Sequence, residues 1–232
     1  MEIHKPKPVH SWRDFLNEVG VIVIGIVIAL SGEQILEAIH WKHKAEAAEQ
    51  DLRKELADSL SYAVEQEQLH QCVSDYLDVL QNAILRSDSD TIKKLYDAGI
   101  PLDAHPWRSS SWTAALNGQV ADHLAHEKVA AYSIAFRLVT AAGEWQNQLA
   151  DHYAEAMIGR FGLPRDPQVV SAQLVAIDKI RREEAQRLDI SDTLARTSRQ
   201  SLNLTPATAR DAEFQNRVKA CQDSLRSLST GH

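Results

Sequence analysis

An uninterrupted apolar run near the N-terminus constrains this chain more than any other feature of its sequence. Residues 19–32 read VGVIVIGIVIALSG, fourteen uncharged residues between Glu18 and Glu33. As an α-helix this run is about 21 Å long, which is shorter than the roughly 30 Å hydrocarbon core of a bilayer. The run therefore crosses a membrane only if its flanks contribute.

Two tryptophans flank the run at the spacing of the two bilayer interfaces. Trp12 and Trp41 are 29 residues apart, which is roughly 44 Å along a helix and close to the thickness of a bilayer with its headgroup layers. Trp side chains favour both interfaces. The sequence therefore predicts one membrane-spanning helix over residues 12–41, preceded by a short tail of residues 1–11.

The apolar run has two other interpretations. A cleaved signal peptide fits the basic residues Lys5, Lys7 and Arg13 and the small residues at 29 and 31. Against it, the helical pattern continues through residues 34–39 without a turn-forming break. A buried core helix is the other alternative, but a β-branched run that is apolar on every side is rarely needed in so small a domain. We therefore expect a retained anchor.

The basic residues near the run give a small bias in orientation. Lys5, Lys7 and Arg13 precede it, whereas Lys42 and Lys44 follow it. Because basic residues favour the cytoplasmic side, we expect a cytoplasmic N-terminus and a domain of residues 42–232 in the periplasm or outside the cell.

Two cysteines bear on the same question. Cys72 and Cys221 are the only cysteines of the chain. In an oxidising compartment they could form a disulfide, whereas two free buried thiols are equally compatible with the sequence.

The remaining sequence predicts an all-α fold. Only 9 Gly and 7 Pro interrupt 232 residues, and apolar residues recur at helical spacing. We expect a bundle of about four main helices that continues from the membrane helix. The predicted helical segments are 33–86, 91–98, one from Trp112 capped by the serines at 109–111, one from about 127 to 158, 168–202, and a last helix that opens at Thr205-Pro206 and runs towards Leu228.

One face of the predicted membrane helix differs from the rest. On a helical wheel, its small residues and both carboxylates fall within an arc of about 100°. This face consists of Glu18, Ile22, Gly25, Ala29, Gly32, Glu33 and Leu36. Small residues let a partner backbone approach closely, and burial against protein keeps the carboxylates from lipid. The alternative is that both Glu side chains extend to the interfaces and that the small residues coincide.

The ten histidines do not form a metal-binding motif. His123 and His126 share one helical face, beside Glu127 and with His152 further along, but HExxH and CxxC motifs are missing. Surface or core histidines are therefore expected, and no cofactor is predicted. Nucleophile motifs such as GxSxG and SxxK and glycine-rich phosphate loops are missing as well. We therefore expect no enzymatic activity, unless distant helices assemble an unrecognised site.

Aromatic residues of the predicted domain offer a further candidate site. Trp107, Trp112, Tyr132 and Trp145 could line an apolar ligand pocket between helices, although core packing is the preferred explanation for them. Nucleic acid is not an expected ligand, because the net charge is −7 and basic residues form no phosphate-binding track.

Two sequence motifs resemble an uncharacterised bacterial family of single-pass membrane proteins. The first is the opening WRDFLNEVGVIVIGIVIALSGEQ, and the second combines Ser111, Trp112, Ala115, Leu116 and Gly118 with the later Val129 and Tyr132. The resemblance implies a short N-terminal tail, a membrane helix and a helical domain. A bacterial inner membrane is then the expected location. The family offers no activity or ligand to transfer.

These observations lead to two functional hypotheses. The first is a non-enzymatic accessory or interaction subunit of a bacterial membrane protein assembly, whose membrane helix binds another membrane protein or a second copy of itself. The second is an extracytoplasmic domain that binds a small ligand and acts through a partner, because the tail of residues 1–11 is too short for a signalling domain.

Overall fold

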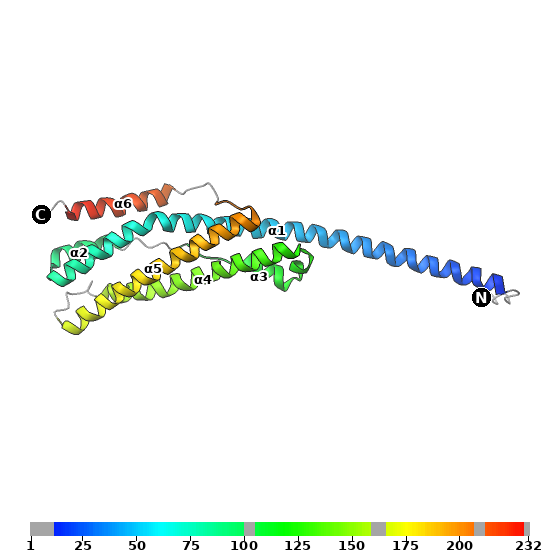
Figure 1. Ribbon diagram of the computed structural model, residues 1–232, viewed down its shortest axis with the longest axis horizontal. Coiled ribbons are helices and arrows are strands. Elements are labelled where there is room, and N and C mark those ends of the chain that lie inside the picture. Colours follow the sequence, from blue (N-terminus) through cyan, green and yellow to red (C-terminus); the bar gives the residue numbers. More distant parts are fainter. Residues whose placement is uncertain (1–11, 100–104, 159–165, 207–211, 230–232) are drawn as a thin grey trace, which may run out of the picture. The chain divides into compact units, whose positions relative to one another are not determined.

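The computed structural model describes residues 12–99, 105–158, 166–206 and 212–229. This part of the chain is all-helical and contains no strand, which confirms that the protein is all-α (Figure 1). The residues divide into two compact units, Met1–Ala47 and Ala48–His232. Helix α1, Trp12–Arg86, covers the end of the first unit and the start of the second. The tail of residues 1–11 lies outside the described residues.

The second unit is built on three long helices. They are the later part of α1, α4 (His126–Ala156) and α5 (Pro167–Leu202). One apolar cluster joins α1 residues 73–84 to α4 residues 149–156 and α5 residues 176–180. A second joins α1 residues 52–60 to α4 residues 131–139, α5 residues 194–202 and Leu204, which follows α5. Helices α1 and α4 therefore run in the same direction, and α5 runs antiparallel to both.

The core positions of these helices follow the alternating spacing of three and four residues that is typical of coiled coils. On α1 they are residues 52, 56, 59, 63, 66, 70, 73, 77, 80 and 84; on α4, residues 132, 135, 139, 142, 146, 149, 153 and 156; on α5, residues 173, 177, 180, 184, 187, 191, 194 and 198. All are buried except His70 and Gln146, which are half-buried. The domain is therefore a three-helix coiled coil to which shorter helices are added.

Short helices follow α1 and precede α4. Helix α2, Ser89–Ala98, begins after Asp88, whose side chain accepts a hydrogen bond from the Thr91 backbone at 3.1 Å, and it ends at Gly99 with a φ of 75°. This helix contains the predicted helical segment 91–98. Helix α3, Ser110–Asn117, and the 3-10 turn η1, Val120–His123, lead into α4.

The prediction that a serine side chain caps the start of α3 is wrong. The side chain of Ser109 makes no capping hydrogen bond. Instead, the Glu55 carboxylate of α1 accepts hydrogen bonds from the backbone of Ser110 at 2.9 Å and of Ser111 at 2.7 Å. A residue 55 positions away thus satisfies the first amides of α3, which local sequence patterns cannot indicate.

The start of the last helix also differs from the expectation. Thr205 and Pro206 are not helical, because Asn203 adopts a left-handed conformation that ends α5 and Leu204 is buried in the second apolar cluster. Arg53 of α1 fixes this ending by donating a hydrogen bond to the Leu202 carbonyl at 3.1 Å. The last helix, α6, is Ala212–Ser229.

Candidate functional site

The first unit exposes a long apolar helix surface. Within α1, one helical window is long and apolar enough to cross a membrane, and none of that window is buried. Val21, Ile28 and Leu36 are 71, 67 and 70% exposed. Burial of apolar side chains normally stabilises a helix in water, and within the described part of the chain this window has no such burial.

The proposed interface face lies wholly on this exposed surface. Glu18, Ile22, Gly25, Ala29, Gly32, Glu33 and Leu36 are all exposed. A Cβ atom added at Gly25 or Gly32 would meet no atom within 4 Å. The helical conformation that the wheel assumed is present, and the small-residue face is open to a neighbour.

The two flanking tryptophans have different surroundings. Trp12 is 72% exposed and stacks on Phe15 at 5.5 Å between ring centroids. Trp41 is half-buried, donates a hydrogen bond of 3.4 Å to Glu37 and lies under the Lys44 ammonium, 4.7 Å from the ring centroid. An aromatic ring with charged neighbours suits the interface of a bilayer.

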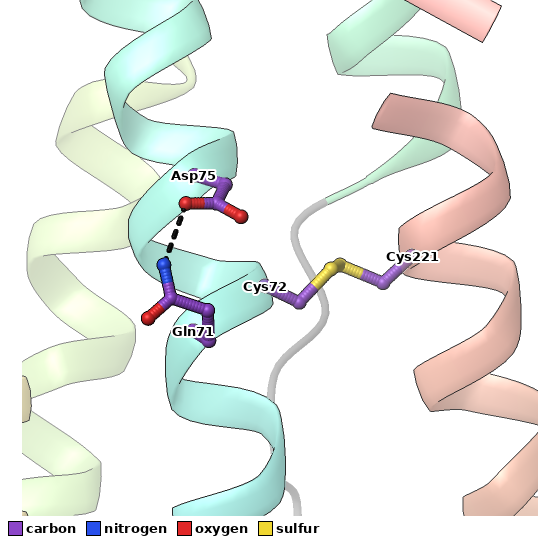
Figure 2. Close-up of a disulfide and its surroundings, with 4 residues drawn as sticks. All are labelled: Gln71, Cys72, Asp75 and Cys221. Carbon is purple, nitrogen blue, oxygen red and sulfur yellow. Dashed lines mark hydrogen bonds between the residues drawn. A yellow bond between two sulfur atoms is a disulfide. The ribbon is translucent and has the colours of Figure 1, made fainter. Parts of the chain in front are cut away.

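The two cysteines are joined. Figure 2 shows the disulfide between Cys72 on α1 and Cys221 on α6, beside the Gln71 side chain, which donates to Asp75 at 2.8 Å. The two Cα atoms are 6.3 Å apart, and the two residues are separated by 149 positions in the sequence. Cys72 is 4% and Cys221 is 7% exposed. The bond fixes the last helix to the first.

The four aromatic residues proposed as a pocket are distributed differently. Tyr132 is buried in the second apolar cluster, and Trp107 and Trp112 pack against that cluster. The Trp112 ring is parallel to that of Phe136 at 6.0 Å. Trp145 is half-buried and belongs to neither apolar cluster. These rings pack against core residues, and none of them lines either of the two surface hollows described below.

The histidines do not converge. His123 and His126 are exposed, whereas His152 lies 26 residues beyond His126 on α4, about 39 Å along the helix. His152 Nδ1 instead lies 2.8 Å from the Glu183 carboxylate. Among the described residues, no group of three or more His, Cys, Asp or Glu could hold a metal ion.

Polar core residues in the middle of the coiled coil form a group that the sequence patterns described above did not predict. The Ser191 hydroxyl of α5 donates to Gln66 of α1 at 3.2 Å. One helical turn further on each of these antiparallel helices are His70 and Arg187. On α4, Gln146 occupies the core position before Leu149, and Tyr153 lies seven residues beyond Gln146, within the first apolar cluster. We call these polar core residues the polar layers.

Several polar atoms in these layers have no hydrogen-bond partner in the described part of the chain. They are His70 Nδ1, Gln146 Oε1, Tyr153 Oη, and Nε and Nη1 of Arg187. Arg187 and Tyr153 are only 3% and 4% exposed. Burial, reinforced by the charge of Glu184, raises the pKa of Tyr153 well above its usual value, so its hydroxyl remains a donor. Unpaired buried polar atoms are few in native proteins. In the described part of the chain, four more lie outside the polar layers: Trp107 Nε1, Ser111 Oγ, Tyr132 Oη and Ser198 Oγ.

A hollow opens between α1 and α5, and Ser191 is among its lining residues. It measures about 250 Å³ and is lined by Ala63, Val64, Glu67, Leu188, Ser191, Asp192 and Ala195. Ala63 and Ser191 are core positions of the coiled coil, so the inner wall of the hollow belongs to the bundle core. The other hollow lies over α3 and is lined by Arg108, Ser109, Ser110, Thr113, Ala114 and Asn117.

The sequence did carry a signal for the polar layers. Core spacing on α5 runs from Ile180 to Glu184, Arg187, Ser191 and Leu194. The spacing of apolar residues alone indicates Leu188 instead, which is only half-buried. A strict three-four spacing would have identified charged residues at core positions.

Comparisons of this chain with protein-family models, with curated proteins and with solved structures found no match. The described residues define the class by their fold: an all-α protein with an exposed apolar N-terminal helix and a three-helix coiled coil to which a disulfide joins the last helix.

Proposed function

We propose that this protein is a membrane-anchored, non-enzymatic accessory or interaction subunit of a bacterial membrane protein assembly. The observation that carries the proposal is the apolar helix of the first unit, whose most apolar window is entirely exposed. A lipid bilayer covers most of such a surface, and a second protein or a second copy of this chain covers the face around Gly25 and Ala29.

The face itself argues for a specific partner chemistry. Glu18 and Glu33 on two copies would repel each other unless they were protonated. A partner helix that offers Lys, Arg or a hydroxyl group at these depths avoids that repulsion. Purification in mild detergent followed by mass spectrometry tests this proposal. A co-purifying membrane protein supports it, whereas a clean monomer contradicts it.

A matched pair of variants tests the face. Gly25→Leu places a large side chain where a partner backbone approaches, whereas Val27→Leu changes the opposite side of the helix. We expect Gly25→Leu to weaken association by about tenfold or more, equivalent to about 1.4 kcal/mol or more, and Val27→Leu to leave it unchanged. Equal energy-transfer signals from the two variants would contradict the assignment.

The location proposed is the bacterial inner membrane, with a cytoplasmic N-terminus and a periplasmic helical domain. The Cys72–Cys221 disulfide supports an oxidising compartment, and the basic residues before the apolar run support this orientation. Alkylation of thiols at lysis, followed by denaturation and labelling with and without reduction, tests the first argument. Two free thiols in freshly lysed cells would contradict it, and reporter fusions at His232 test the orientation.

Mass spectrometry of the mature chain separates anchoring from cleavage. Retention of the residues before Glu33 is expected for an anchor, and carbonate extraction should leave the chain in the membrane fraction. A mature chain that begins near Ser31 would instead identify the apolar run as a signal peptide.

A second candidate function is the sensing of a small ligand by the helical domain, with the signal passed through a partner. The unpaired polar atoms of His70, Gln146, Tyr153 and Arg187 favour it, because buried polar atoms without a partner can bind a polar ligand. Thermal-shift measurements across a metabolite library test this function. A uniformly flat response would contradict it.

A further inference from the structure

We propose that the hollow between α1 and α5 binds a small organic cation, in which a short apolar chain carries a primary ammonium group. The inference rests on the second candidate function and derives a ligand class from the residues that line the hollow. It uses none of the unpaired atoms of the polar layers and does not require the membrane anchor.

The wall of the hollow is aliphatic on both helices. Ala63 and Val64 line it from α1, and Leu188 and Ala195 line it from α5. These four side chains are buried or half-buried. An alkyl chain that enters the hollow therefore removes apolar surface from water on the ligand and on both helices. The volume of about 250 Å³ admits only a small molecule.

The opening of the hollow carries negative charge from both helices. Glu67 of α1 and Asp192 of α5 are its exposed lining residues, and no Lys or Arg lines it. One oxygen of Asp192 lies 3.4 Å from Arg196 Nε. Within the described part of the chain, Glu67 makes no ion pair. An ammonium group at the opening is attracted from two sides, and an anion is repelled.

The two helices supply little basic charge that could compete with such a ligand. Helix α1 has no Lys or Arg between Lys54 and Arg86. On α5, the basic residues that flank the lining segment are Arg187 and Arg196. Arg187 is buried and donates to Glu184 at 2.9 Å, and Arg196 is exposed. The negative charge at the opening is therefore only partly compensated by the protein itself.

The inner wall adds a hydrogen-bond acceptor. Ser191 lines the hollow and is only 4% exposed. Its hydroxyl donates to Gln66 at 3.2 Å, so the lone pairs of the Ser191 oxygen remain able to accept. A second N–H or O–H group at the far end of the ligand can donate to this oxygen while the bond to Gln66 is kept. Small diamines and amino alcohols combine both features with an apolar chain.

The charge of the ligand is tested on the full chain in detergent with its disulfide intact. The probes are propylamine, propionamide and propionate, which are nearly equal in size and differ in charge. The readout is the saturable change in amide chemical shifts of residues 63–67 and 188–195. We expect propylamine to bind at least about tenfold more tightly than propionate, with propionamide between them, and added salt to weaken the binding of propylamine.

Matched variants locate the binding. The double variant Glu67→Gln with Asp192→Asn removes both carboxylates, and we expect it to weaken propylamine binding by about three- to tenfold. Glu144→Gln, at an exposed position of α4 that does not line the hollow, should preserve binding. Ala195→Leu fills the wall and should abolish binding, whereas Ala172→Leu adds the same atoms at an exposed position of α5 and should preserve it.

Three outcomes would overturn the proposal. They are no saturable shifts with propylamine, equal binding of propionate, and undiminished binding in the variant that lacks both carboxylates. The second candidate function fails separately, because it requires only that some compound of a metabolite library raises the melting temperature. An anionic or neutral compound that does so, together with no binding of propylamine, would keep the sensing function and refute this site.

Discussion

Arg187 and Glu184 form an ion pair across one turn of α5, and each side chain is only 4% exposed. The Arg187 Nη2 group donates to both carboxylate oxygens, while its Nε and Nη1 groups have no partner within the described residues. A pair this deeply buried loses hydration that its mutual attraction only partly restores. Its effect on stability therefore depends on whether one partner or both are removed.

Removal of Arg187 alone should be severe. Arg187→Met leaves the Glu184 carboxylate buried without its cation, so we expect the free energy of unfolding to fall by about 3–5 kcal/mol. The double variant Arg187→Met with Glu184→Leu should recover wild-type stability or exceed it. Urea denaturation measures both variants, and Arg196→Met in the exposed Arg196–Asp192 pair is the control. A double variant no more stable than Arg187→Met would contradict this account.

The capping of α3 by Glu55 predicts a pH dependence. Burial raises the pKa of Glu55, but hydrogen bonds from Ser111 and Ser110 outweigh burial and hold the pKa below its usual value of 4.5. Because the folded pKa is lowered, this carboxylate stabilises the fold above pH 4.5, and the contribution disappears as the pH falls through the lowered pKa.

Glu55→Gln tests this contribution. We expect the variant to be about 1 kcal/mol less stable than the wild type at neutral pH, and the difference to vanish in acid. The control is Glu67→Gln, which changes an exposed carboxylate on the same helix. Denaturation curves across the acidic range measure the effect. A difference between Glu55→Gln and wild type that persists in acid would show that packing, not charge, is responsible.

The disulfide should hold α6 more strongly than its packing does. On α6, the residues turned towards the bundle are Phe214, Val218, Cys221 and Leu225, and most other described residues of this helix are exposed. Among the described residues, Leu204 is the last buried position before α6. While α1 and α5 stay packed together, the disulfide therefore closes only the chain between Leu204 and Cys221, a loop of roughly 15–20 residues. Closure of a loop of this length is worth about 3 kcal/mol in the chain-entropy model.

Reduction should therefore release α6 before the coiled coil unfolds. We expect amides of Ala212–Ser229 to lose protection from hydrogen exchange after reduction with a dithiol, while those of α4 and α5 keep it. Cys221→Ala should reproduce this result without reductant. Unchanged protection of α6, or simultaneous loss of protection in all helices, would contradict the prediction.

Trp107 approaches α4 closely at Gly143, where a larger residue would meet it. A Cβ atom added at Gly143 would lie 3.2 Å from the Trp107 Cβ. Gly143→Val should displace the tryptophan and lower the free energy of unfolding by about 1–3 kcal/mol. Tryptophan fluorescence and urea denaturation check both effects, with Ala130→Val at an exposed position of α4 as the control. An unchanged emission spectrum would show that Trp107 accommodates the larger residue.

The sequence determined the helices whose signals are local. The apolar run and the regular spacing of residues such as Leu52, Leu56 and Leu60 predicted a long first helix, because helical periodicity is a property of neighbouring positions. Asp88 and Gly99 similarly fixed both ends of α2. The exposure of the small-residue face followed from the same periodicity.

Only the tertiary structure decided which distant residues meet. Glu55 replaces the serines as the cap of α3, the ending of α5 by Asn203 and Leu204 moves the start of α6, and the bundle brings Cys221 to Cys72. The polar layers depend on the same alignment, since Arg187 and His70 occupy one depth only when α5 packs antiparallel to α1. Local preferences do not encode such pairings, because the free energy that selects them comes from burying surfaces that are far apart in the chain.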